Sequence, residues 1–307
     1  MKIKYDLVTV LGPTACGKTR FAACLADRMN SEIISADSRQ VYKRMDLGTG
    51  KDYSDYMING RAIPYHLVDI LEPGEKYNVF EYQKDFLQAY NAVSQKGKVP
   101  VLCGGTGLYI DAVTKGYRLI PVPPDHKLRK ELESNSLDEL TAILKGYKKL
   151  HNKTDVDTKK RAIRAIEIEE YYKTHPEFNK DYPLINNIFI GIRFSREIIR
   201  ERITRRLHTR LGQGMIEEVE NLLNEELKAE DLIYYGLEYK FITLYLTGEL
   251  SYEEMFEKLN IAIHQFAKRL MTWFRKMERE GAVIHWMEEN LEIKDKVEKA
   301  IELIQHV

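Results

Sequence analysis

Residues 12–19 read Gly12-Pro13-Thr14-Ala15-Cys16-Gly17-Lys18-Thr19 and follow an apolar run at 7–11. This octapeptide fits the G-x-x-x-x-G-K-[ST] phosphate loop, in which main-chain N–H groups and the N-terminus of the next helix surround anionic oxygens. A helix-compatible stretch at 20–26 supplies the context that the motif requires. The sequence therefore predicts a site for a di- or triphosphate. The alternative is a turn that has this spacing by chance.

Residues of this loop have distinct predicted tasks. Gly12 and Gly17 let the backbone curl around the phosphates, and Lys18 supplies a positive charge. The hydroxyl of Thr19 can ligate Mg²⁺, the one metal ion we expect. The loop residues expected to bind a diphosphate are Gly12, Thr14, Ala15, Cys16, Gly17, Lys18 and Thr19.

Composition limits the class of protein. The chain has 307 residues and a formal net charge of zero, so the overall charge gives no argument for nucleic-acid binding. Cys16, Cys24 and Cys103 lack the spacing of a zinc site and look like reduced thiols. No secretory segment is visible, and no stretch approaches the ~20 apolar residues of a spanning helix. We expect a cytoplasmic protein that does not enter a membrane.

Apolar runs alternate with helical stretches up to about residue 117. Strands are predicted near 5–11, 32–35 and 99–103, and strand-like runs return at 187–192 and 282–286. This alternation predicts an α/β fold, with a P-loop NTPase-like parallel sheet, helices on both faces and right-handed crossovers.

The sequence predicts two domains. Residues 1–120 and 187–307 are expected to form the α/β core, whose C-terminal part is helical. Residues 121–186 read as an inserted helical subdomain without a convincing strand.

Asp37 follows the predicted strand at 32–35, within Ser35-Ala36-Asp37-Ser38. Ligands of open α/β folds bind at the carboxyl edge of the sheet, so this carboxylate is expected beside the phosphate loop. A base next to a bound diphosphate indicates group transfer. The alternatives for Asp37 are a Mg²⁺ ligand of the Walker-B kind and a helix N-cap.

An arginine-rich helix is expected after Ser195. Its arginines are Arg196, Arg200, Arg202, Arg205, Arg206 and Arg210. A spacing of four residues places Arg202 beside Arg206, so one face of the helix is basic. The alternative for each arginine is a solvated face paired with Glu197 and Glu201.

Two further basic regions are visible. One lies in and after the insertion and contains Lys145, Lys148, Lys149, His151, Lys153, Lys159, Lys160, Arg161 and Arg164. Lysine-rich helices often bind nothing, so this cluster alone is weak evidence for nucleic-acid binding. The other region offers candidates for RNA or diphosphate contact, namely Lys268, Arg269, Arg275 and Lys276. Its aromatic residues have helical spacing and are therefore assigned to packing: Phe266, Trp273 and Phe274.

Several blocks together resemble the tRNA dimethylallyltransferases of the bacterial type, also called tRNA isopentenyltransferases. They are the phosphate loop, SADSRQVYKRMDLGT at 35–49, HLVDI at 66–70, GGTGLY at 104–109, RAIRAIE at 161–167 and QFAKRLMTWFR at 265–275. The blocks run in the family's order from residue 12 to residue 275. The D-S-x-Q-x-Y block together with G-G-T-G-L-Y is far more specific than the phosphate loop alone.

This resemblance implies a reaction. A five-carbon allyl group would pass from dimethylallyl diphosphate to N6 of the adenosine 3′-adjacent to the anticodon, in tRNAs that read codons starting with U. By resemblance Asp37 accepts the proton of the amine, Thr106 orients the reacting groups, and Arg202 binds the leaving diphosphate with Arg206 in reserve. The enzyme is expected to act as a monomer.

The resemblance also implies contacts to tRNA. Gln40 would read an adenine edge, and the insertion would grip the anticodon stem through its basic residues. The residues assigned to tRNA in this way are Ser38, Gln40, Lys160, Arg161, Arg164, Gln265, Lys268 and Arg269.

The sequence departs from the family at two places. Family members often carry G-Y-[KR]-[EQ] where this chain has Gly236-Leu237-Glu238-Tyr239-Lys240, and His264 stands where an arginine is frequent. These changes bear on tRNA or diphosphate contacts rather than on the reaction class. Two rival functions use the same loop: a small-molecule or nucleotide kinase, and a nucleotide-gated binding module without chemistry.

Overall fold

The computed structural model describes residues 3–148, 150, 154–175, 182–225 and 227–305. These form two compact units, one of residues 1–116 with 184–307 and one of residues 117–183. The expected insertion at 121–186 thus begins and ends a few residues early in the structure. Lys149, His151 and Lys153 of the basic cluster lie outside the described residues.

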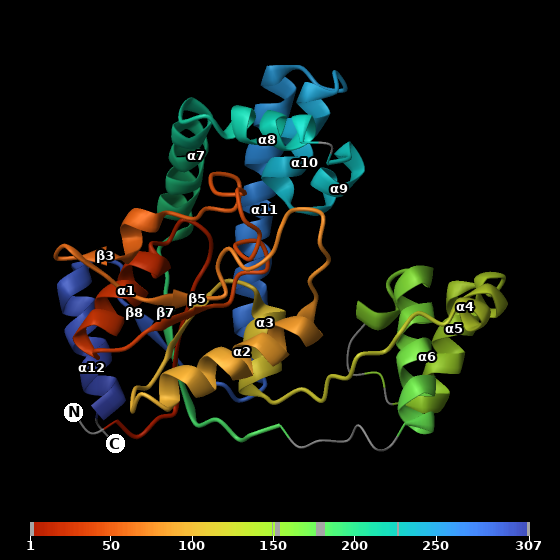
Figure 1. The fold of residues 1–307 in the computed structure, drawn as a ribbon, viewed down its shortest axis with the longest axis horizontal. Coiled ribbons are helices and arrows are strands. Elements are labelled where there is room, and N and C mark those ends of the chain that lie inside the picture. The colour runs from red at the N-terminus through yellow and green to blue at the C-terminus, as the bar shows by residue number, and fades with distance from the viewer. Residues whose placement is uncertain (1–2, 149, 151–153, 176–181, 226, 306–307) are drawn as a thin grey trace. The chain divides into compact units, whose positions relative to one another are not determined.

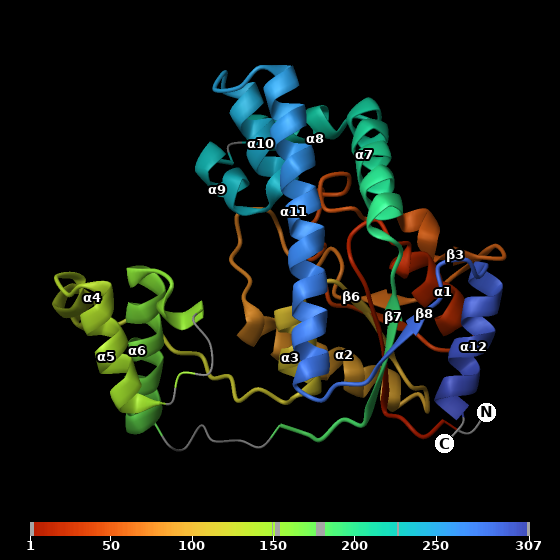
Figure 2. The ribbon, with the colours of Figure 1, turned by 180° about the vertical axis from the view of Figure 1, so that it is seen from behind.

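The first unit is built on a six-stranded parallel sheet, which Figures 1 and 2 show from opposite sides. The strands follow the order β5-β2-β6-β1-β7-β8. Its strands are β1 (Leu7–Leu11), β2 (Ile33–Ser35), β5 (Tyr65–His66), β6 (Val101–Gly104), β7 (Asn187–Ile192) and β8 (Ile284–Met287). All five strands expected from the sequence are present within about two residues. The parallel sheet is therefore confirmed.

Three short strands were not expected. They are β5 and the separate antiparallel hairpin of β3 (Met57–Ile58) and β4 (Arg61–Ala62), which follows the short 3₁₀ helix η1 (Tyr53–Tyr56). Strands of two residues are too short to show an alternating pattern, so no sequence signal announces them.

Helices cover both faces of the sheet. The helices α1 (Lys18–Arg28) and α12 (Ile293–Gln305) pack together on one side, and α2 (Val79–Ser94) and α3 (Gly107–Thr114) pack together on the other (Figures 1 and 2). The expected arginine-rich helix is α7 (Arg196–Gly212). The helical C-terminal part follows as α8 (Met215–Asn224), α9 (Ala229–Tyr234), α10 (Leu237–Leu246) and the long α11 (Tyr252–Arg279).

Strand register brings three loops to one edge of the sheet. Leu11 at the end of β1 lies opposite Gly104 of β6, and Ser35 at the end of β2 lies opposite Cys103 of β6. The carboxyl ends of these adjacent strands are therefore level. The phosphate loop, the loop that contains Asp37 and the loop that contains Thr106 leave the sheet side by side.

The second unit has a small apolar core of its own. Its helices α4 (His126–Glu133), α5 (Leu137–Tyr147) and α6 (Lys159–Thr174), with the 3₁₀ helix η2 (Thr154–Val156), enclose Leu132, Leu140, Leu144, Ala162, Ala165 and Ile166. As expected, no strand occurs in the described residues of this unit. Among the described residues of the whole chain, no helix is both long and apolar enough to cross a membrane.

A buried carboxylate connects the helices of this unit. Glu167 on α6 is 2% exposed and accepts hydrogen bonds from Arg129 of α4 at 2.8 Å and from the N–H of Asp125 at 2.6 Å. It also pairs with Arg164 on its own helix. Burial by itself raises the pKa of Glu167, but these hydrogen bonds outweigh burial and lower it to about 2.

Candidate active site

The phosphate loop reaches α1 through two residues in the left-handed region. Ala15 has a φ of 61°, and Gly17, the N-cap of α1, has a φ of 78°, which glycine adopts without strain. No side chain caps α1, so its first N–H groups are left for an anion. The ammonium of Lys18 lies 3.5 Å from the carbonyl oxygen of Pro13 and thus folds back over the loop.

A cavity of about 1180 Å³ opens beside this loop, and we call it the phosphate-loop cavity. Its lining includes Thr14, Ala15, Gly17, Lys18 and Thr19. Gly12 and Cys16 of the loop are not among the residues that line the cavity, so their predicted part in binding the diphosphate stays a prediction. A Cβ on Gly12 would lie only 2.5 Å from the carbonyl oxygen of Ile192.

Asp37 and Thr106 both line this cavity. The Asp37 carboxylate accepts the N–H of Arg39 at 2.9 Å, and the Thr106 hydroxyl accepts the N–H of Ser38 at 3.1 Å. The two loops are therefore joined beside the carboxylate. No helix begins at Asp37, so the N-cap alternative for this residue is wrong.

One face of α7 lines the cavity with Arg202, Arg206 and Arg210, spaced four residues apart. Arg210 is buried and contacts both carboxylate oxygens of Asp52, at 3.0 and 2.9 Å. Arg206 donates to the hydroxyl of Thr14 in the phosphate loop. Within the described part of the chain, no carboxylate forms an ion pair with Arg202 or Arg206, so both charges are available to an anion.

The other arginines of α7 lie elsewhere. Arg205 lines the cavity but pairs with Glu201, four residues earlier, as the solvated alternative predicted. Arg196 and Arg200 line a second cavity of about 1030 Å³ formed by residues of α7, α11 and β8.

Glu238 at the start of α10 brings a carboxyl group into the phosphate-loop cavity, which Arg206 and Arg210 also line. Burial raises its pKa, while the positive charges of Arg206 and Arg210 act in the opposite direction. Burial, and then the charge of Arg210, lowers the pKa of Arg206 to about 10. Arg206 is thus still cationic at neutral pH.

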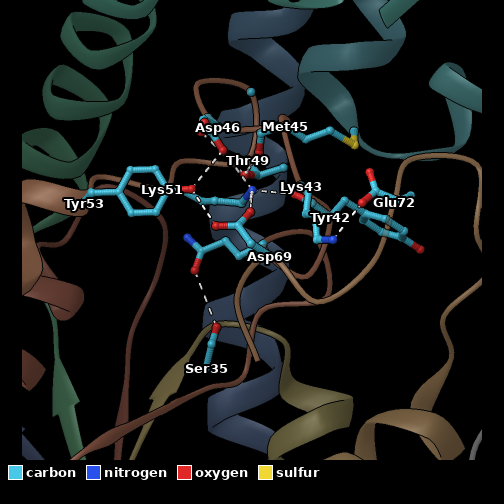
Figure 3. Close-up of polar contacts among 12 residues, drawn as sticks. Ser35, Tyr42, Lys43, Met45, Asp46, Thr49, Lys51, Tyr53, Asp69 and Glu72 are labelled. Atoms are coloured by element: carbon cyan, nitrogen blue, oxygen red, sulfur yellow. Dashed lines mark hydrogen bonds and ion pairs between the residues drawn. The ribbon is translucent and has the colours of Figure 1, made fainter. Parts of the chain in front are cut away.

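A buried lysine holds the loop that follows Asp37. Lys51 is 6% exposed, and its ammonium contacts Asp46 at 2.9 Å, Asp69 and the carbonyl oxygen of Tyr42 (Figure 3). The hydroxyl of Tyr53 donates to Asp69 at 2.6 Å. This network fixes the loop whose residues 48–50 and 52 line the phosphate-loop cavity.

A second contact fixes the same loop from the C-terminal helices. The carboxylate of Glu218 on α8 accepts the N–H groups of Asp46, Leu47 and Gly48 at 2.8, 2.7 and 3.0 Å. The hydroxyl of Tyr239 donates to it at 2.6 Å. Neither Lys51 nor Glu218 was identified from the sequence: Lys51 belongs to none of the recognised motifs, and Glu218 contacts Asp46, 172 positions away.

The residues assigned to tRNA occupy three places. Ser38, Gln40 and Arg269 line the phosphate-loop cavity, and Gln265 and Lys268 line the second cavity. The Gln40 side chain already donates to the carbonyl oxygen of Gly50 at 3.1 Å. Only part of its hydrogen-bonding capacity is left for a base.

The remaining three lie on α6 in the second unit. Arg161 pairs with Asp157, and Arg164 pairs with Glu167 and donates to the carbonyl oxygen of Val122 at 2.8 Å. Lys160 is exposed, and the described residues give it no ion-pair partner.

The assignment of the α11 aromatic residues to packing is correct for Phe274, which is fully buried, and wrong for Phe266. Phe266 is 39% exposed and lines the phosphate-loop cavity together with Trp273. Trp273 also donates to the buried Asp111 at 3.0 Å. A Cβ on Gly107 would lie 2.3 Å from its ring, so glycine is required there.

Sequence reasoning did not select two further cavity residues, Arg39 and Arg210. Arg210 could have been found, because it continues the four-residue spacing of Arg202 and Arg206. Arg39 lies in the variable position of the D-S-x-Q block, where the motif gives no signal.

A phosphate loop, a carboxylate and unpaired arginines around one cavity at the carboxyl edge of a parallel sheet define a P-loop protein that handles a phosphorylated substrate. Comparison with known proteins identifies the family. Residues 40–277 match the model of the IPP transferase family, and residues 5–63 match that of isopentenyl transferases. The chain therefore belongs to the IPP transferases, which include the tRNA dimethylallyltransferases.

Curated relatives agree over nearly the whole length. The chain is 63% identical over 293 residues to tRNA dimethylallyltransferase 2 of Bacteroides fragilis, with 95% of this chain and 96% of that protein covered. It is 61% identical to tRNA dimethylallyltransferase 2 of Phocaeicola vulgatus, with 98% of each covered.

Solved structures agree as well. The tRNA isopentenylpyrophosphate transferase of Staphylococcus epidermidis is 30% identical, with a TM-score of 0.69 over 97% of this chain and 98% of that chain. A eukaryotic dimethylallyltransferase solved acting on tRNA has a TM-score of 0.77 at 20% identity, over 96% of this chain and 77% of that chain. The similarity to the eukaryotic enzyme is a similarity of fold alone.

Proposed function

We propose that this protein transfers a dimethylallyl group from dimethylallyl diphosphate to N6 of the adenosine 3′-adjacent to the anticodon of tRNA. The observation that supports this most is the shared cavity. The phosphate loop, Asp37 and the unpaired Arg202 and Arg206 line the same space. A diphosphate leaving group and an amine proton can thus be handled side by side.

The diphosphate would be bound by the free N–H groups at the start of α1, by Lys18 and by Arg202 and Arg206. As the C–O bond of the allyl diphosphate breaks, negative charge grows on the phosphate oxygens. Fixed positive charges stabilise it where it develops. The cavity lining also includes Phe266, Leu270 and Trp273, apolar side chains suited to the five-carbon chain.

The N6 amine forms the new C–N bond and must lose one proton. Asp37 would accept it; the N–H of Arg39 holds one carboxylate oxygen, which leaves the other for the substrate. Thr106 positions this loop through Ser38. The products are N6-isopentenyladenosine in the tRNA and free diphosphate.

Magnesium fits this site only with help from the substrate. Across the described ranges, no three His, Cys, Asp or Glu side chains gather into a metal site. Mg²⁺ prefers oxygen ligands and commonly uses substrate phosphates with one or two protein oxygens. Thr19 would provide one such oxygen and the diphosphate the others. When bound, the ion would neutralise charge on the leaving group.

A direct assay tests the proposal. Purified protein is incubated with an anticodon stem-loop and dimethylallyl diphosphate, and the RNA is digested to nucleosides for mass analysis. We expect N6-isopentenyladenosine in the digest, and none from a stem-loop whose adenosine after the anticodon is replaced by another nucleoside. Loss of the γ-phosphate of ATP without prenyl transfer would instead establish the rival kinase, and nucleotide binding without any product would establish the binding module.

The proposal also covers the location of the protein, its oligomeric state and its contact with the anticodon stem of tRNA. We infer a monomer acting in the cytoplasm, with the second unit contacting the anticodon stem through exposed Lys160. All three cysteines are free, which agrees with a reducing compartment.

A further inference from the structure

Tyr234, the last residue of α9, presents an aromatic ring to solvent. It is 64% exposed, whereas its neighbour Tyr235 is 3% exposed and accepts the N–H of Gly74 on its hydroxyl at 2.6 Å. The guanidinium carbon of Arg39 lies 5.3 Å from the centroid of the Tyr234 ring. The ring of Tyr235 meets that of Tyr234 edge-on at 6.2 Å. Packing against neighbours thus fixes the ring without covering it.

Arg39 connects this ring to the reaction site. It lines the phosphate-loop cavity, and its main-chain N–H holds the carboxylate of Asp37 two residues earlier. Two residues span at most about 7 Å of chain. Within the described residues, no carboxylate forms an ion pair with Arg39. The pair therefore stands beside the cavity as a cation and an open aromatic face.

This combination suits a nucleobase. Single-stranded RNA is read by stacking splayed bases on aromatic rings and guanidinium planes. A second pair of this type lies at the same cavity, where the guanidinium carbon of Arg269 is 5.7 Å from the ring centroid of the half-exposed Phe266.

We propose that the Arg39–Tyr234 pair stacks the base of a nucleotide adjacent to the target adenosine and so selects the loop that enters the cavity. The inference rests on the proposed function, because it takes the RNA substrate from there. It assigns to the pair a part of substrate recognition, not of the chemistry.

Binding of an anticodon stem-loop, measured without dimethylallyl diphosphate, tests the role of the ring. Tyr234→Ala should weaken binding by about 5- to 100-fold, the usual effect of losing one stacked base. Tyr234→Trp should retain wild-type affinity. Tyr252→Ala removes another exposed tyrosine, 41% exposed, and serves as the matched control with unchanged affinity. Wild-type affinity in Tyr234→Ala would overturn the proposal.

The RNA provides a second, independent measurement. Stem-loops that lack one base beside the target adenosine are bound to wild-type protein and to Tyr234→Ala. If that base stacks on Tyr234, its removal weakens wild-type binding and has no further effect on the variant. Equal losses in both proteins at every neighbouring position would exclude the stacking contact. Wild-type turnover in the standard assay is a separate result, so failure of the stacking proposal and failure of the proposed function are distinguishable.

Discussion

Single side chains carry the proposed chemistry, and Asp37 is the one that a conservative change tests most directly. Asp37→Asn keeps an oxygen for the N–H of Arg39 but cannot accept a proton. We expect an unchanged unfolding midpoint, unchanged diphosphate affinity and turnover at least ~10²-fold slower, the usual scale for losing a general base. The measurement is single-turnover prenyl transfer at saturating RNA. Full activity would remove Asp37 from the mechanism, and Asp231→Asn on the exposed part of α9 is the control.

Lys51 tests the network that holds the cavity loop. Lys51→Met leaves the carboxylates of Asp46 and Asp69 close together without their buried partner. Removing one member of a buried ion pair typically destabilises a protein by about 3–5 kcal/mol. Urea unfolding should show a loss of this size. Lys43→Met, which breaks the exposed pair with Glu72, should change stability by no more than about 1 kcal/mol. Similar losses in both variants would contradict this interpretation.

The same residues show what the sequence predicts and what it cannot. Lys18, Asp37 and Arg202 were found because motif and spacing place them relative to local elements. Glu218 was missed because its contact with Asp46 joins residues 172 positions apart, and Lys51 was missed because it follows the motif at 35–49 without belonging to it. Phe266 was misassigned because helical periodicity marks one face of α11 without saying whether that face meets a core or a cavity.

At the scale of elements, α6 is attached to α4 by the buried carboxylate of Glu167. Its pKa of about 2 is below the ordinary value of 4.5. The stabilisation is therefore complete above about pH 4.5 and is lost as the pH falls toward 2. Glu167→Gln should cost about 2–3 kcal/mol at neutral pH and flatten this acid dependence.

Hydrogen exchange followed by mass spectrometry can locate this effect in the full chain. Amides of α4 and α6 should lose protection in Glu167→Gln, whereas those of β1 and α11 should keep it. Glu131→Gln changes an exposed carboxylate on α4 and is the matched control. Uniform loss of protection over both units would show that the ion-pair cluster does not act locally.

For helices and strands too, the sequence predicted what has a local pattern and missed what depends on distant partners. The central strands β1 and β7 were recognised because they are continuous apolar runs, as expected of strands buried on both faces. The two-residue strands β3, β4 and β5 owe their existence to pairing partners, so they leave no local signature. The predicted boundary of the second unit was a few residues off because the segments that flank it carry no periodic pattern.

For the whole molecule, the order of strands has a consequence for synthesis on the ribosome. The central strand β1 has β6 on one side and β7 on the other, and Leu7 lies opposite Asn187. Until β7 has left the exit tunnel of the ribosome, one edge of β1 has no hydrogen-bonding partner. Nascent chains that end before residue 187 should therefore be poor folders and good clients for chaperones, and a stop codon in the second unit should yield aggregates in place of a functional half.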